Sequence, residues 1–189
     1  MKVIVACEYS GRVRQAFRNL GHEAYSCDLL PSLDKSPYHY QDNIFNLLDG
    51  SNYFDLLIAH PPCTHLAVSG ARWFKDKLVE QEQALQFVKD LMNVNIQKIC
   101  IENPVSIISS KIRKPDQIIQ PWMFGDPYTK TTCLWLKNLP KLVPNNIVDK
   151  GEIVIHGGKR IQKWYSNRSI PRDMTFFGIA NAMAEQWNF

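Results

Sequence analysis

The stretch KVIVACEYSGRVRQAFRNLG, residues 2–21, indicates the fold class. Its first part, residues 2–8, is β-branched and apolar like a buried strand, and Ser10 and Gly11 close it with a turn. Residues 12–21 have helical periodicity and end on a glycine, which commonly terminates a helix. Four apolar residues share one face of this predicted helix: Val13, Ala16, Phe17 and Leu20. A strand, a turn and a helix in succession are typical of α/β folds.

The rest of the chain continues this alternation. Further strands are predicted at residues 23–30, 54–60, 98–103 and 131–136. Helical patterns follow at 42–49, with Asp42 as the expected N-cap, and at 69–94 and 178–187, whereas residues 31–41 read as a loop. We therefore expect an α/β fold, a Rossmann-like and mostly parallel sheet with helices on both faces.

The length of 189 residues suits one domain, so residues 1–189 are expected to form a single unit. Its least regular part is predicted at about 140–174. Basic residues gather there, with Trp164 and Tyr165 between them: Lys150, Lys159, Arg160, Lys163, Arg168 and Arg172. A mixture of basic and aromatic side chains can bind a polyanion such as DNA, although a solvated loop would have the same composition.

The composition excludes several classes of protein. No run of 18 apolar residues is present and the first residues lack the features of a signal peptide, so we expect a cytoplasmic protein. The five cysteines form no C-x-x-C pair, which argues against a disulfide framework or a cysteine-rich zinc site. His60 and His65 have no third ligand in register, so no metal is predicted.

Polar residues follow the first strands of the predicted sheet. Glu8, Ser10 and Gly11 come after the first strand, Asp28 ends the second, and Asp42 opens the next turn. In an open parallel sheet, ligands bind beyond the carboxyl ends of the strands, where an acid can accept hydrogen bonds from ribose hydroxyls. No G-x-G-x-x-G motif is present to cradle a pyrophosphate. A nucleoside cofactor without phosphates, such as S-adenosylmethionine, therefore fits better.

The two later strand ends carry reactive side chains. Residues 61–63 are Pro-Pro-Cys, and residues 102–104 are Glu-Asn-Pro. The thiol of Cys63 and the carboxyl of Glu102 would then lie on adjacent loops at one edge of the sheet. A thiolate is a strong nucleophile, and a protonated carboxyl can deliver a proton to the molecule under attack. The prolines would hold the sulfur at a fixed position, which lowers the entropic cost of the attack.

These motifs in this order resemble the DNA (cytosine-5)-methyltransferases. The resemblance covers residues 2–108 well and 176–187 loosely. It rests on the segments VACEYSG (5–11), QDNIFNL (41–47), HPPCTHLAVSG (60–70), IENPVSI (101–107) and GIANAMAEQW (178–187), together with Asp28. Cys63 and Glu102, at this spacing and in this order, are its most specific part.

The resemblance implies an S-adenosylmethionine-dependent methyltransferase fold that acts on DNA. Cys63 would attack carbon 6 of cytosine, Glu102 would protonate or hydrogen-bond ring nitrogen 3, and Asn103 would help to hold the loop. Carbon 5 would then take the methyl group, lose its proton and release the thiolate, after the base had been flipped out of a duplex. Substrate contacts are implied for Pro62, Thr64, Lys130 and Thr132. The implied cofactor-binding residues are Glu8, Tyr9, Ser10, Gly11, Asp28, Leu29, Asp42, Asn43, Ile44, His60, Pro61 and Asn181.

The chain departs from the family pattern at several positions. The family's Gln after the cysteine is Thr64, its Phe-Ser is Leu66-Ala67, and its Arg-x-Arg pair is replaced by Lys130 and Thr132. Only about forty residues separate the strand at 131–136 from the last segment, too few for a separate target-recognition domain. We expect the protein to recognise a short DNA sequence or none. Alternatively, a homodimer or a partner protein supplies the recognition. By analogy, the small size suggests a bacteriophage or mobile-element protein.

Three other hypotheses remain open. A related enzyme that methylates a free pyrimidine nucleotide would need no recognition domain. A non-catalytic methyltransferase-like protein could bind or inhibit a partner, although Cys63 and Glu102 are both present. An amino-group methyltransferase would carry an aromatic residue after Pro-Pro, where this chain has Cys63.

Overall fold

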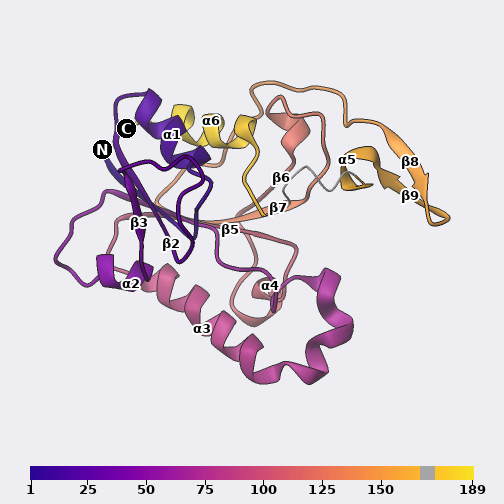
Figure 1. Cartoon of the computed structure of the whole chain (residues 1–189), viewed down its shortest axis with the longest axis horizontal. Helices are drawn as coiled ribbons and strands as arrows, with labels where there is room; N and C mark the ends of the chain where they lie inside the picture. Colours follow the sequence, from indigo (N-terminus) through magenta and orange to yellow (C-terminus); the bar gives the residue numbers. More distant parts are fainter. Residues whose placement is uncertain (167–172) are drawn as a thin grey trace.

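The computed structural model describes residues 1–166 and 173–189, and its centre is a seven-stranded sheet (Figure 1). The strand order is β3-β2-β1-β4-β5-β7-β6. The first five strands are parallel, whereas β7 runs antiparallel to both β5 and β6. The strands are β1 (Lys2–Ala6), β2 (Glu23–Asp28), β3 (His39–Gln41), β4 (Leu56–Ala59), β5 (Lys98–Pro104), β6 (Gln117–Ile119) and β7 (Thr132–Lys137).

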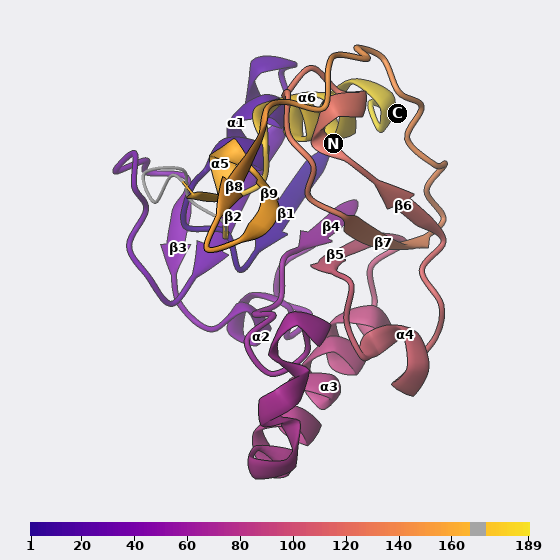
Figure 2. The ribbon, with the colours of Figure 1, turned by 90° about the vertical axis from the view of Figure 1, so that its right-hand side faces the viewer.

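Helices cover both faces of the sheet, as predicted (Figures 1 and 2). Helices α1 (Arg12–Asn19) and α6 (Phe177–Gln186) pack together on one face. The other face carries α2 (Ile44–Leu47), α3 (Leu78–Asn93) and α4 (Ile108–Lys111). Alternate residues of each strand enter opposite cores, Val3 and Val5 on the α1 side and Ile4 on the α3 side. Because both faces are buried, the central strands are almost continuously apolar.

The segment that was expected to be irregular contains a hairpin. Strands β8 (Ile153–His156) and β9 (Lys159–Gln162) pair antiparallel as a separate two-stranded sheet that projects from the body. Gly157 and Gly158 form its turn with φ of 55° and 75°, a conformation that glycine adopts without strain. The short helices η2 (Pro121–Met123) and α5 (Lys163–Ser166) lie on either side of it in the sequence. The expected basic residues Arg168 and Arg172 lie outside the described residues.

Other elements differ from the sequence-based expectation. Strand β3 forms inside the expected loop at 31–41, and the single helix expected at 69–94 is divided. Its first part is the 3₁₀ helix η1 (Val68–Asp76), which buries no residue, and α3 begins after Lys77. Asn43 rather than Asp42 caps α2, because its side chain accepts a hydrogen bond from the Phe45 amide. Across residues 1–166 and 173–189, no helix combines the length and the apolar composition that crossing a membrane requires.

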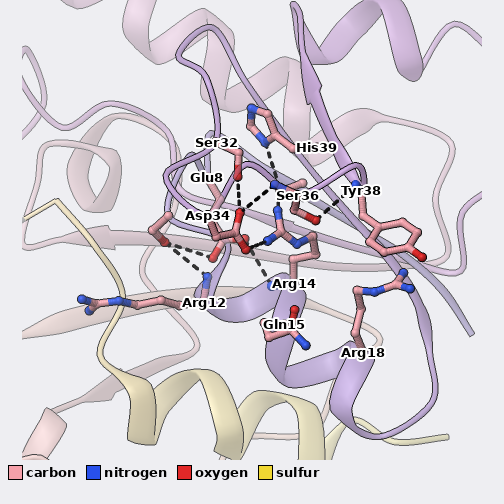
Figure 3. A network of polar contacts seen from close by, with 12 residues as sticks. Glu8, Arg12, Arg14, Gln15, Arg18, Ser32, Asp34, Ser36, Tyr38 and His39 are labelled. Carbon is pink, nitrogen blue, oxygen red and sulfur yellow. Dashed lines mark hydrogen bonds and ion pairs between the residues drawn. The ribbon is translucent and has the colours of Figure 1, made fainter.

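A buried arginine ties α1 to its surroundings (Figure 3). The Arg14 side chain has no solvent exposure, donates to Ser26 Oγ at 2.8 Å and forms an ion pair with Asp34. Asp34 also accepts hydrogen bonds from Ser32 Oγ and the Ser36 amide. Because Ser26 belongs to β2 and Asp34 to the loop that follows it, one guanidinium joins helix, strand and loop. A buried charge of this kind costs stability unless it remains paired.

We predict that Asp34→Asn lowers the free energy of unfolding by about 2 kcal/mol, since it leaves the buried guanidinium without its counter-charge. The loss is smaller than for a fully buried pair because the Asp34 side chain is 42% exposed. Urea unfolding at pH 7 measures it, with Asp76→Asn as the control at an exposed carboxylate.

The ion pair between Arg14 and Asp34 also makes the free energy of unfolding depend on pH. Burial raises the pKa of Asp34, but the hydrogen bond from Ser32 and the charge of Arg14 outweigh it, and the pKa is lower than usual. The stabilisation is therefore present above the unfolded pKa and is lost as pH falls through the folded pKa. The difference between wild type and Asp34→Asn should shrink below about pH 4. A difference that stays constant down to pH 2 would contradict this role.

Candidate active site

A pocket of about 270 Å³ opens at the carboxyl ends of the parallel strands. It lies where the strand order reverses, since β1 pairs with β2 on one side and with β4 on the other. Open α/β sheets bind their ligands at such a switch point. The lining residues are Cys7, Cys27, Asp28, Leu29, Asp42, Asn43, Ile44, Pro62, His65, Ala84 and Phe87.

Five of the residues implied as cofactor contacts meet in this pocket: Asp28, Leu29, Asp42, Asn43 and Ile44. Asp28 ends β2, and its carbonyl accepts a hydrogen bond from the Asp42 amide at 3.0 Å, which fixes the two acids relative to each other. Ile44, Ala84 and Phe87 supply apolar surface. The pocket can therefore accept a ligand with an apolar ring and neighbouring hydroxyl groups.

The first loop does not line this pocket as the resemblance implied. Cys7 has a left-handed φ of 57° and lines the pocket, after which the chain turns away. Glu8 is buried and accepts hydrogen bonds from the Val13 amide at 2.6 Å and the Arg14 amide at 3.2 Å. It thus binds the free N–H groups at the start of α1. Burial raises the Glu8 pKa.

The other residues of the first loop make contacts within the protein. The Ser10 hydroxyl donates to Glu8 at 3.4 Å, and the Tyr9 hydroxyl donates to Asp173 at 2.7 Å. Gly11 has a φ of 72°, and a Cβ there would collide with the guanidinium of Arg14. The absence of a side chain at Gly11 therefore meets a packing requirement of Arg14. Asn181 is exposed on α6 and does not line the pocket.

The pairing of β4 with β5 builds a second group of polar residues. Ala59 lies opposite Ile101 in this parallel pair, so the next residues, His60 and Glu102, come side by side. His60 Nδ1 is 3.2 Å from Glu102 Oε2. Burial raises the Glu102 pKa, but the hydrogen bond and charge of His60 and the charge of Lys130 outweigh it, and the pKa is lower than usual. The lowered pKa favours the ionised form of Glu102 beside His60.

Asn103 fixes the Pro-Pro-Cys loop to β5. Its side chain is buried, and its Nδ2 donates to the Pro61 carbonyl at 2.7 Å. The Cys63 carbonyl then accepts hydrogen bonds from the Leu66 and Ala67 amides. The backbone of Cys63 is therefore held from both sides while its side chain stays exposed. Pro62 lines the pocket and directly precedes Cys63, so a ligand in the pocket lies next to the thiol-bearing loop.

The electrostatic surroundings of Cys63 come from three elements. Partial burial raises the pKa of its thiol, the negative charge of Glu102 raises it further, and Lys130 lowers it. Thr132, at the start of β7, is buried and hydrogen-bonds Glu102, while the exposed Thr64 follows Cys63. Glu102 and Lys130 thus act electrostatically on the thiol, and Thr132 hydrogen-bonds Glu102.

Two residues of this group have no signal in the sequence. The charge of Asp173 raises the pKa of Cys63, and Thr175 Oγ1 lies 3.5 Å from His60 Nδ1. The Thr175 carbonyl also accepts a hydrogen bond from Arg12 at 2.9 Å. Both precede α6, far along the chain from the residues they contact. The described residues contain no group of three His, Cys, Asp or Glu side chains that could hold a metal ion.

No protein-family model matches the chain, and no curated protein matches its sequence. Among solved structures, it is similar to a proposed DNA modification methyltransferase encoded within a prophage, from E. coli, with a TM-score of 0.55 and 16% sequence identity. The match covers 78% of this chain and 51% of that one, so the chain spans about half the length of that protein. The likeness shows that the chain shares the fold of that protein.

We predict that Glu102→Gln accelerates alkylation of Cys63 by iodoacetamide at pH 8 by roughly threefold or more, since only the thiolate reacts. The substitution removes the negative charge that raises the thiol pKa and leaves the positive charge of Lys130 in place. Peptide mass spectrometry isolates the rate at Cys63 from those of the other cysteines. Glu80→Gln, at an exposed site on α3, is the control, and an equal rate in both variants would show that Glu102 does not act on the thiol.

Proposed function

We propose that the chain is an S-adenosylmethionine-dependent methyltransferase that transfers a methyl group to carbon 5 of cytosine in DNA through a covalent Cys63 adduct. One observation carries the proposal: the exposed thiol follows Pro62, which lines the pocket, and lies within the electrostatic reach of Glu102 and Lys130. A nucleophile, a hydrogen-bonding carboxyl and a cofactor-sized pocket then share one edge of the sheet.

The residues of the pocket fit S-adenosylmethionine. Asp28 would accept hydrogen bonds from the ribose hydroxyls, and Asp42, Asn43 and Ile44 would contact the adenine. Glu8 already binds the N–H groups at the start of α1, the position where a pyrophosphate would otherwise bind. The site is therefore suited to a cofactor without phosphates. When bound, that cofactor supplies an electrophilic methyl group.

The chain's own residues would perform the rest of the reaction. The Cys63 sulfur forms a bond to carbon 6, and Glu102 hydrogen-bonds or protonates ring nitrogen 3, which accepts the displaced electron density. Carbon 5 becomes nucleophilic and is methylated. It then gives its proton to a water molecule acting as base, and the carbon–sulfur bond breaks to release the thiolate. Lys130, which precedes β7, and Thr132, which begins it, would contact the base. Asn103 keeps the loop in register through its hydrogen bond to Pro61.

DNA is the substrate that the chemistry and the comparison favour, because the similar structure is described as a DNA modification methyltransferase of a prophage. A bacteriophage protein that works in the cytoplasm is consistent with that source. The β8–β9 hairpin exposes Lys159 and Arg160 in place of a recognition domain, and such side chains suit phosphate contacts. A homodimer or a partner protein would supply any further recognition.

We expect a covalent adduct when the protein is incubated with S-adenosylmethionine and DNA containing 5-fluorodeoxycytidine, because fluorine at carbon 5 blocks the final elimination. Denaturing gel electrophoresis and mass spectrometry detect it. Cys63→Ala should abolish the adduct, while Cys100→Ala, at a buried strand position, should retain it. An adduct on free 5-fluorodeoxycytidine monophosphate alone would make a nucleotide the substrate. If no substrate forms one although the folded protein binds the cofactor, the proposal is wrong.

We predict that Asp28→Asn weakens S-adenosylmethionine binding about tenfold, since hydrogen bonds to a charged acceptor contribute roughly 1.5–3 kcal/mol. Asparagine keeps the oxygen that accepts from the Leu30 amide, so the local backbone is retained. Isothermal titration calorimetry measures the change, with Asp76→Asn as the control. Unaltered affinity would place the cofactor elsewhere.

A further inference from the structure

His60 lies beside Glu102 in a space largely closed to water. Its side chain is 8% exposed, and its Nδ1 is 3.2 Å from Glu102 Oε2. Burial raises the pKa of Glu8, the acid bound to the start of α1, and the charge of His60 offsets part of that shift. The contact on which the inference depends is therefore the one between His60 and Glu102.

The groups that face His60 come from every neighbouring element. Glu102 belongs to β5, Glu8 to the loop after β1, and Thr175 to the segment before α6, with its Oγ1 3.5 Å from Nδ1. Lys130, before β7, acts on Glu102 from the other side. Within residues 1–166 and 173–189, His60 Nε2 is buried without a hydrogen-bond partner. Among the described residues, the ring's polar contact to an acidic side chain is the one with Glu102.

The proposed chemistry requires a proton that Glu102 does not hold. The pKa of Glu102 is lower than usual, so its carboxyl is ionised in the free protein. An ionised carboxylate only accepts hydrogen bonds, whereas ring nitrogen 3 of neutral cytosine is itself an acceptor. Two acceptors cannot bind each other without a proton between them. The nearest titratable partner that can supply one is His60.

We infer that His60 is a positioning residue that carries the proton used by Glu102 and returns it to the pair after each turnover. This inference rests on the proposed function. The N–H bond of the imidazolium breaks as an O–H bond forms on Glu102, and that bond breaks as ring nitrogen 3 takes the proton. The imidazole of His60 is left neutral, and the cytosine ring carries the positive charge that promotes attack by sulfur. When the thiolate is eliminated, nitrogen 3 gives the proton back by the same route.

The test compares wild type with His60→Asn, whose amide can donate a hydrogen bond to Glu102 but cannot exchange a proton. The rate of adduct formation on 5-fluorodeoxycytidine DNA is measured between pH 6 and 8. At pH 8 the variant should be about 100-fold slower, the usual contribution of general acid–base catalysis. The deficit should shrink toward pH 6, where Glu102 takes its proton from solvent. His22→Asn, at a residue that directly precedes β2 and hydrogen-bonds the N-terminal amine of Met1, is the control.

A second measurement does not depend on methyl transfer. Carbon-13 NMR of the labelled Glu102 carboxyl should show a higher pKa in His60→Asn, because burial is no longer offset by the histidine's charge. His60→Gln serves if the asparagine variant does not fold. An unchanged Glu102 titration, or a deficit equal at every pH, would overturn the inference. If wild type forms no adduct on any substrate but the titration shifts, the proposed function fails and the coupling of His60 to Glu102 stands.

Discussion

The parallel pairing of β4 with β5 is the constraint on which the candidate site depends. Because Ala59 lies opposite Ile101, the residues that follow are matched in turn, His60 with Glu102 and Pro61 with Asn103. One register therefore fixes the contact between His60 and Glu102, a buried hydrogen bond and the start of the Cys63 loop. A shift by a single residue would turn Glu102 to the other face of the sheet and separate it from His60.

The buried polar residues of the first loop stabilise the structure that supports the pocket. Glu8 binds the start of α1, and Arg14 joins that helix to β2 and to the loop containing Asp34. The glycine-containing turn supports the helix, and Cys7 lines the pocket. The ligand-facing acids come instead from the ends of β2 and β3, where the backbone bond between Asp28 and Asp42 sets their separation.

The charges around Cys63 keep its thiol weakly reactive when no substrate is bound. Partial burial and Glu102 keep the thiol largely protonated, and Glu102 is itself paired with His60. A proton that passes from the His60–Glu102 pair to a bound base leaves the negative charge of Glu102 in place and gives the base a positive charge. The pair would therefore activate the base rather than the thiol. Because the sheet edge is poorly solvated, these charges act strongly on one another.

The sequence by itself determined the alternation of strands and helices, the strand ends that carry Cys63 and Glu102, and the acids of the pocket, because hydrophobic period and prolines are local signals. The sequence also contained the Gly-Gly turn of the β8–β9 hairpin, although its composition led us to expect an irregular segment there. Only the tertiary structure decided the antiparallel direction of β7, the role of Glu8, and the presence of Asp173 and Thr175 beside the site. These depend on contacts between residues far apart in the chain, and no periodicity encodes which distant backbone or charge a side chain will meet.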